Sequence, residues 1–114
     1  MRMLQTHSVN EQLKEILIEL RRRFAEIYGD RLVHLILYGS RARGDAAPDS
    51  DIDVLVVLNG VVNPGDEISR TGKITAALSL HYSVVISCVF VSAERYFTEQ
   101  SPLLLNVRRE GVSI

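Results

Sequence analysis

The sequence predicts one α/β (α+β) domain spanning residues 1–114, with a small mixed β-sheet flanked by helices. Three segments, at residues 32–38, 51–58 and 84–91, are short, rich in branched aliphatic side chains and bounded by turn residues, as strands are. Segments with helical periodicity precede, separate and follow them. The expected order is therefore helix, strand, strand, helix, strand, helix. A chain of this length buries roughly 65% of its unfolded surface, which is enough for one core.

Composition narrows the class of protein. The chain is 46% hydrophobic and 24% charged with a net charge of -1, so it has the balance of an ordinary globular protein. Because basic residues do not outnumber acidic ones, a dedicated nucleic-acid binder is not expected. No signal peptide is readable at the start, and no apolar run approaches the ~20 residues needed to cross a bilayer. The single cysteine, Cys88, lies in an apolar run, which predicts a buried thiol and a cytoplasmic protein.

An amphipathic helix is expected first. Ser8 and Glu11 fit a capping box, and Gly29 provides the stop. The apolar positions recur at helical spacing: Val9, Leu13, Ile16, Leu17, Leu20, Phe24 and Ile27. Within this helix, the cations at 21–23 point about 100° apart and cannot form one flat basic face. They are interpreted as a solvated helix end, with a docking point for an acidic partner as the alternative.

The first two strands flank a polar turn. Strand 32–38 stops at Gly39 and Ser40, a polar connection follows, and strand 51–58 opens with Asp51 and Asp53. Because side chains alternate along a strand, the two carboxylates project from one face, with Cα atoms roughly 6.6 Å apart. The sequence therefore predicts two like charges close together.

Such a pair requires a cation, either Arg41, Arg43 or a metal ion. Mg²⁺ takes oxygen ligands and is commonly held by one or two carboxylates together with nucleotide phosphates. The turn at 39–40 offers backbone N–H groups and a hydroxyl that suit phosphate oxygens. One short segment thus combines candidate metal ligands with a candidate phosphate site. The alternative is a pair of exposed carboxylates whose charge is neutralised by Arg41 and Arg43.

The second half of the chain alternates helix and strand. Asn63 and Pro64 suit the cap and first turn of a helix over 66–80, whose apolar residues are sparse. Strand 84–91 is almost wholly apolar, so we expect it to be central or covered on both faces. A short helix can start at 92–95. A last helix should follow Ser101 and Pro102 and end at Gly111, with residues 112–114 trailing off.

The remaining histidines and aromatic residues suggest packing. His34 and His81 are interpreted as structural, and His7 as solvated. Tyr82, Tyr96 and Phe97 are interpreted as core or edge aromatics, with a place for one of them beside a nucleobase as the alternative.

The segment GSRARG at 39–44, followed by a short spacer and Ser50-Asp51-Ile52-Asp53, resembles the signature of the minimal nucleotidyltransferase (MNT) family. This family belongs to the DNA polymerase beta-like nucleotidyltransferase superfamily. Its fold has the element order expected above, and the likeness extends over nearly the whole chain, including the closing stretch 106–111. The resemblance implies a nucleotidyltransferase fold and Mg²⁺-dependent transfer of a nucleoside monophosphate, AMP from ATP, to an acceptor.

The resemblance also implies residue roles. Asp51 and Asp53 would be the catalytic, Mg²⁺-binding carboxylates, and Gly39 and Ser40 would hold the β- and γ-phosphates. Arg43 is a further phosphate contact, because a guanidinium can grip two oxygens at once. Arg41 is a weaker candidate that could point to solvent instead.

One departure from the family pattern concerns a third carboxylate. Active members of the superfamily carry one on the next strand, whereas residues 83–91 contain no Asp or Glu. Ser83 or Ser87 stands where it is expected, and Glu94 lies beyond the strand. Three alternatives remain open: slow catalysis, a carboxylate supplied from elsewhere, or lost catalysis.

Small stand-alone MNT proteins are often antitoxins, paired with a helical HEPN-type toxin that they bind and, in some systems, modify with AMP on a tyrosine. The resemblance therefore implies an antitoxin with a HEPN-type partner. The alternatives are a degenerate module that acts by contact alone and a nucleotide sensor without transfer. The acceptor, the donor base and pairing of two copies through an apolar edge or helix face stay open.

Overall fold

The computed structural model describes residues 2–3, 11–44 and 50–114. The predicted cap residue Ser8, the predicted helix residue Val9 and the predicted solvated His7 lie outside the described residues. The elements, in chain order, are β1 (Arg2–Met3), α1 (Glu11–Tyr28), the 3-10 helix η1 (Gly29–Arg31), β2 (Leu32–Tyr38), α2 (Ser40–Arg43), β3 (Ile52–Leu58), α3 (Pro64–Tyr82), β4 (Ile86–Ser92), α4 (Ala93–Thr98), α5 (Pro102–Glu110) and β5 (Val112–Ser113).

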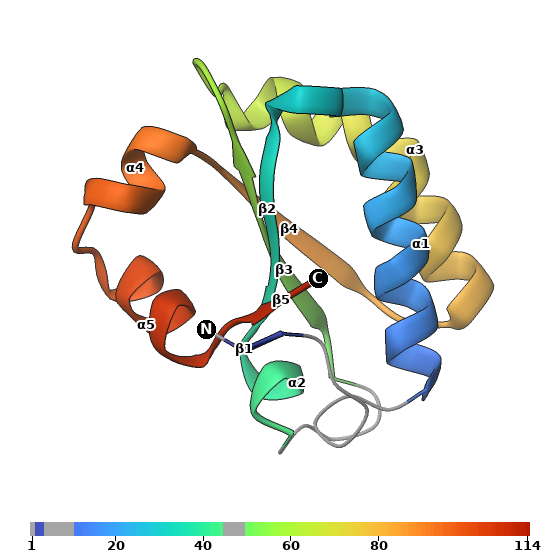
Figure 1. Ribbon diagram of the computed structural model, residues 1–114. Coiled ribbons are helices and arrows are strands. Elements are labelled where there is room, and N and C mark those ends of the chain that lie inside the picture. The colour runs from blue at the N-terminus through green and yellow to red at the C-terminus, as the bar shows by residue number, and fades with distance from the viewer. Residues whose placement is uncertain (1, 4–10, 45–49) are drawn as a thin grey trace.

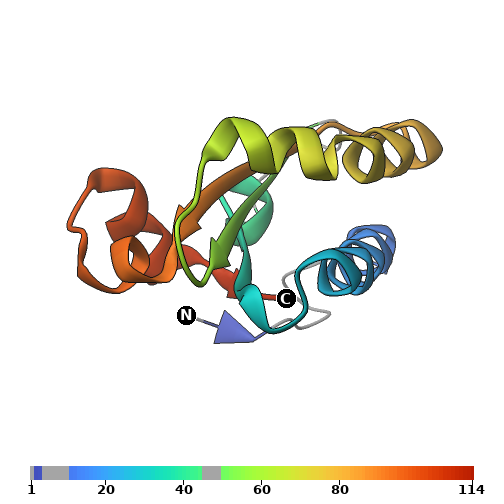
Figure 2. The same cartoon turned by 90° about the horizontal axis from the view of Figure 1, so that it is seen from above.

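The strands form one mixed sheet in the order β1-β5-β2-β3-β4. β2 is antiparallel to β3 and β5, whereas β3 is parallel to β4 and β1 to β5. Helices α1 and α3 lie on one side of the sheet, and α4 and α5 on the other (Figure 1). The view from above shows the same separation (Figure 2). The predicted class, a small mixed sheet flanked by helices, is confirmed.

Alternation along the strands divides the core in two. On one face, Leu35 and Val54 join a cluster with Phe24 of α1 and Leu78 of α3. On the other face, the aliphatic side chains of β2 and β3 join residues of α4 and α5: Ile36, Leu55, Val57, Tyr96, Leu104 and Val107. Both faces of β3 are therefore covered.

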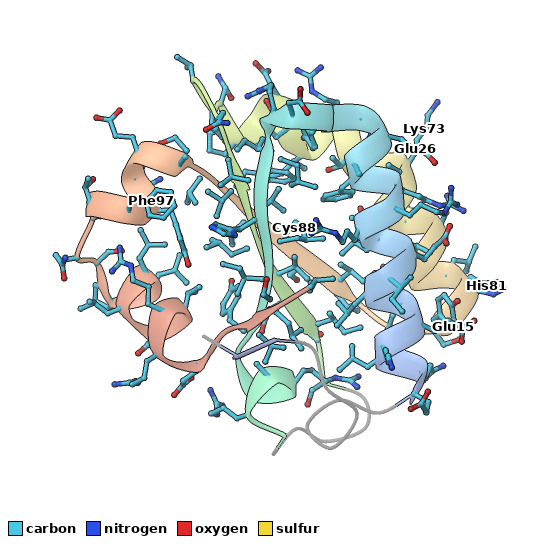
Figure 3. All side chains as sticks on the ribbon, viewed as in Figure 1. Glu15, Glu26, Lys73, His81, Cys88 and Phe97 are labelled. Carbon is cyan, nitrogen blue, oxygen red and sulfur yellow. The ribbon has the colours of Figure 1, made fainter. Side chains whose placement is uncertain are left out.

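Among the described residues, helix α1 buries the predicted apolar stripe with one exception. Ile27 remains 37% exposed, and Tyr28 is buried in its place at the end of the helix. The Tyr28 hydroxyl donates a hydrogen bond to Glu67 at 2.7 Å, so its polar end is satisfied inside the core. Charged residues such as Glu15 and Glu26 lie at the outer surface of this helix (Figure 3).

Helix α3 is longer than the predicted 66–80. It begins at Pro64, and the Asn63 side chain accepts from the Asp66 N–H at 3.3 Å, as expected for its cap. Two of its sparse apolar residues face outward, since Ile68 is 55% and Leu80 84% exposed. Glu67 is buried instead, because hydrogen bonds from Tyr28 and Arg70 satisfy its carboxylate.

Strand β4 is at the edge of the sheet rather than central, but it is covered on both faces, the other form of the expectation, because α3 and α4 pack against it and its side chains join both core clusters. One expectation for the end of the chain is wrong. Residues 112–113 do not trail off but form β5, in which Val112 pairs with Leu37. Gly111 makes this abrupt return possible, because a Cβ there would lie 2.5 Å from the Val107 carbonyl oxygen and 2.6 Å from Cγ2 of Ile36.

Among the described residues, no helix combines the length and apolar composition needed to cross a membrane.

Candidate active site

The turn expected after β2 is a single helical turn, α2. Gly39 adopts φ 76° and ψ -159°, and the backbone then enters α2 at Ser40. The carbonyl of Gly39 accepts from the N–H groups of Ala42 at 3.1 Å and Arg43 at 3.2 Å. Because few residues other than glycine adopt a positive φ of this kind, Gly39 is what allows the chain to leave the strand here.

Gly39 lies directly against Asp53. A Cβ placed on Gly39 would be 2.7 Å from Oδ2 of Asp53, which is closer than Cβ atoms normally approach any heavy atom. Tyr38, the residue before it, pairs in register with Asp53 across β2 and β3. The glycine turn and the second aspartate, 14 positions apart in sequence, therefore lie side by side in the fold.

The two aspartates differ in environment. Strand β3 begins at Ile52 rather than at residue 51, so Asp51 precedes the strand and is exposed, whereas Asp53 is partly buried. Burial and the negative charge of Asp51 raise the pKa of Asp53 above its ordinary value. A cation placed between them would relieve both effects.

The donor set fits a hard divalent cation. Two carboxylates supply oxygen ligands, and the close approach at Gly39 leaves room beside Asp53 that a side chain would fill. The described residues contain no group of three or more His, Cys, Asp or Glu side chains that could hold a metal ion by themselves. The remaining positions around such an ion would fall to phosphate oxygens and water, as is usual for Mg²⁺.

The two arginines of the turn make separate contacts. Arg41 donates from Nε at 3.1 Å and Nη2 at 2.8 Å to the carbonyl of Ser50, the residue before Asp51. It therefore does not merely point to solvent. Arg43 donates from Nη1 to Oε2 of Glu110 at 3.2 Å, which ties α2 to the end of α5.

Register identifies the position of the expected third carboxylate. Ser87 of β4 is the Cα partner of Asp53 in the parallel pair, so both side chains lie on the same face of the sheet. Ser83 instead caps the end of α3 at φ 55°, outside the strand. Of the two serines, Ser87 therefore stands beside Asp53.

Tyr38 completes this row and was not singled out by sequence reasoning. Its side chain shares the face of Asp53 and Ser87 because the three residues pair in register across three strands. Burial and the charge of Asp53 raise the pKa of the Tyr38 phenol. Its only sequence signal is its place immediately before Gly39.

Other chemistry-bearing residues have structural surroundings. The His34 ring lies 5.4 Å from that of Tyr96, and the His81 ring 4.7 Å from that of Tyr82, which agrees with packing roles. Cys88 is partly rather than fully buried, and burial raises the pKa of its thiol to about 12. A thiol of this kind is a poor nucleophile at neutral pH.

The basic run of α1 lies within the helix rather than at its end. Arg22 pairs with Glu19 and with Glu26, the latter at 2.7 Å, and Arg23 pairs with Glu19 at 2.9 Å. Arg21 donates to the carbonyl of Ile114 at 2.8 Å. The run is thus occupied by contacts within the chain.

Comparison with known proteins gives consistent results. Residues 17–107 match the Nucleotidyltransferase domain family. "Putative protein adenylyltransferase MJ0141" of Methanocaldococcus jannaschii is 34% identical over 76 residues, covering 67% of this chain and 76% of the relative. The similarly named MJ1305 of the same organism is 32% identical over 98 residues, covering 86% of this chain. This chain spans only 58% of the length of that second relative.

Solved structures share the fold. The "putative nucleotidyltransferase from Sulfolobus solfataricus" superposes with a TM-score of 0.58 at 20% identity, covering 87% of this chain and 76% of that one. A structure described as "the toxin-antitoxin with AMP-PNP" gives a TM-score of 0.58 at 18% identity, covering 87% of this chain and 69% of that one. At these identities the likeness concerns the fold alone.

Proposed function

Because this chain belongs to the nucleotidyltransferase domain family, we propose that it transfers AMP from ATP to an acceptor protein in a Mg²⁺-dependent reaction. The observation that carries the proposal is the contact between the Gly39 turn and Asp53. It joins a backbone suited to phosphate oxygens with carboxylates suited to a divalent cation. Both are what a nucleoside triphosphate requires.

Each site residue then has a role. Asp51 and Asp53 hold the metal ion, and Gly39 and Ser40 receive the β- and γ-phosphates at the start of α2. Arg43 adds a positive charge on the same turn. When held by Asp51 and Asp53, Mg²⁺ would supply positive charge that offsets the negative charge of the phosphates. The acceptor hydroxyl attacks the α-phosphorus, pyrophosphate leaves, and the site residues contribute mainly by positioning and by charge.

A protein acceptor is supported by the two M. jannaschii relatives, each of which is named "Putative protein adenylyltransferase". A toxin partner is supported by the toxin–antitoxin structure that shares the fold. We therefore propose that the chain is an antitoxin and that its partner and acceptor is a toxin of the HEPN type. The same proposal places the protein in the cytoplasm and treats residues 1–114 as one nucleotidyltransferase-like domain.

A second candidate function follows from Ser87. With a hydroxyl in place of the third carboxylate, the described part of the site lacks the usual base beside Asp53. Losing a general base costs about 10²–10⁴-fold in rate. A degenerate antitoxin that binds its partner by contact alone is therefore the alternative, and it predicts partner binding without turnover.

Calorimetric titration of Mg²⁺–ATP into the protein tests the metal and nucleotide roles. We expect binding by the parent and by Asp30→Ala, whose side chain is exposed on η1. Asp53→Ala should retain the fold, by circular dichroism, and lose binding. The metal role would be wrong if Asp53→Ala bound Mg²⁺–ATP as tightly as the parent.

A further inference from the structure

We propose that β4 pairs with β4 of a second copy of this chain, antiparallel, about a two-fold axis at Cys88, so that two five-stranded sheets become one. Strand β4 is the outer strand of the sheet, and no strand of the described chain lies beyond it. It is seven residues long, whereas β1 at the opposite edge has two. The longer edge is thus the one left open.

The backbone hydrogen bonding between β4 and β3 shows which backbone groups of β4 point outward. The carbonyl of Val85 accepts from the N–H of Ile52 at 2.8 Å, so Val85 faces β3. Because backbone groups alternate along a strand, the N–H and C=O groups of Ile86, Cys88 and Phe90 point away from β3.

The edge also lacks the usual features that prevent strand pairing. Natural edge strands carry charged side chains, proline or a bulge, or are very short. Strand β4 reads ISCVFVS, with no charge and no proline, and its register with β3 is continuous. An uncharged strand of this length is a template for another strand.

The side chains near the edge favour an apolar occupant. On the α3 side, a groove of about 260 Å³ is lined only by uncharged residues: Ile68, Thr71, Thr75, Ile86, Ser87, Cys88 and Phe90. Ile68 is 55% exposed, and Val85, next to the first residue of the strand, is 56% exposed. A strand added here would cover apolar surface without placing a charge in the groove.

A second copy meets these requirements in length, charge and hydrogen bonding, because its own β4 presents the same three outward residues. Antiparallel pairing about Cys88 sets Ile86 of one copy opposite Phe90 of the other, and Cys88 opposite Cys88. Each such pair exchanges two hydrogen bonds, which gives about six across the interface. An isologous contact of this kind closes on itself and forms a dimer rather than a fibre.

The proposed dimer has a consequence for the candidate site. A two-fold axis between antiparallel edge strands is perpendicular to the sheet, so both copies present the same face to the same side. Asp53 and Ser87 of both copies therefore lie on the same face of the joined sheet. Such a surface suits a partner that is itself two-fold symmetric.

The test compares Cys88→Pro with Cys88→Ala in the full chain by sedimentation equilibrium. Proline removes the outward N–H of the central pair and leaves the bonds to β3, which residues 87 and 89 make by the same alternation. Alanine keeps the N–H. We expect dimers for the parent and Cys88→Ala and a folded monomer for Cys88→Pro. A monomeric parent, or a Cys88→Pro variant that still forms a dimer, would overturn the proposal.

If Cys88→Pro fails to fold, amide hydrogen exchange on the parent protein tests the proposed strand pairing instead. Protection of the Ile86, Cys88 and Phe90 amides that increases with protein concentration supports the pairing. Fast exchange of all three at every concentration contradicts it. Protection only after another protein is added would mean that a foreign strand occupies the edge, which also contradicts pairing of two copies.

Discussion

Asp53 of β3 and Ser87 of β4 are partners in the parallel register, with side chains on one face of the sheet. Tyr38 lies on the other side of Asp53 in the same row. The position next to the proposed metal-binding carboxylate therefore holds a hydroxyl. A serine hydroxyl can donate and accept hydrogen bonds, but it does not take a proton as a carboxylate does.

Ser87→Asp should increase the rate of AMP transfer. The new carboxylate would stand beside Asp53 and could accept the proton of the attacking hydroxyl, which is worth about 10²–10⁴-fold. Single-turnover transfer from α-labelled ATP measures the rate. Ser87→Asn, similar in size but unable to act as a base, and Ser83→Asp, outside the strand, are the controls. Equal rates for all three variants would show that position 87 does not limit the reaction.

Gly39→Ala should abolish Mg²⁺–ATP binding. The new methyl group would collide with Oδ2 of Asp53, 2.7 Å away, and the positive φ of 76° adds backbone strain of about 1–3 kcal/mol. Gly60→Ala is the matched control, because Gly60 has φ 85° but no atom within 4 Å of the added Cβ. Both variants should lose stability in urea, and only Gly39→Ala should lose binding in calorimetry. Loss of binding in both would point to a general effect of destabilisation.

Arg41→Ala should weaken Mg²⁺ binding by about 10–100-fold, the usual cost of losing a group that supports a metal ligand. Arg41 holds the carbonyl of Ser50 and so fixes the entry to Asp51. Arg31→Ala is the control, because Arg31 makes the same kind of bonds beyond the far end of β3, to the carbonyls of Asn59 and Val61. Mn²⁺ titration followed by electron paramagnetic resonance gives the affinities. Equal weakening by the two variants would exclude a local role for Arg41.

Glu67→Gln should destabilise the fold by about 1–3 kcal/mol at neutral pH, because a buried hydrogen-bonded carboxylate is lost. Burial raises the pKa of Glu67, but hydrogen bonds from Tyr28 and Arg70 outweigh it and hold the pKa below its ordinary value of 4.5. A carboxyl with a lowered folded-state pKa stabilises the protein above about pH 4.5 and loses this contribution as the pH falls through the folded-state pKa.

Urea unfolding of the parent and of Glu67→Gln at several pH values tests the predicted pH dependence of the Glu67 contribution to stability. The difference in free energy of unfolding should be largest near pH 7 and shrink below about pH 4.5. Glu26→Gln, on the exposed surface of α1, should change stability by only ~0.5 kcal/mol and serves as the control. A difference that grows as the pH falls would contradict the lowered pKa of Glu67.

The elements with strong local patterns are predictable from sequence. The apolar spacing of α1 and the branched residues of β2 place both elements within a residue or two of the observed bounds. Asn63 and Pro64 likewise mark the start of α3. The buried Glu67 could not be predicted, because its partner Tyr28 is 39 positions away.

Features that depend on distant pairing are not visible in the sequence. The two residues of β5 become a strand only because β2 and β1 lie beside them. The apolar composition of β4 correctly indicates a strand covered on both faces, but it does not distinguish a central strand from an edge strand with a helix on each face. For the site, the motif predicts that Gly39 and Asp53 belong together, but only the register between β3 and β4 distinguishes Ser87 from Ser83.

Transfer of label from α-labelled ATP to protein tests nucleotidyl transfer most directly. The assay contains Mg²⁺ and is run with and without the product of the neighbouring gene, for the parent, Asp51→Ala, Asp53→Ala and the control Asp30→Ala. We predict that the parent and Asp30→Ala label the partner protein and that the two site variants do not. A stable complex with the partner and no labelling by the parent would contradict the transferase and identify an antitoxin that acts by contact.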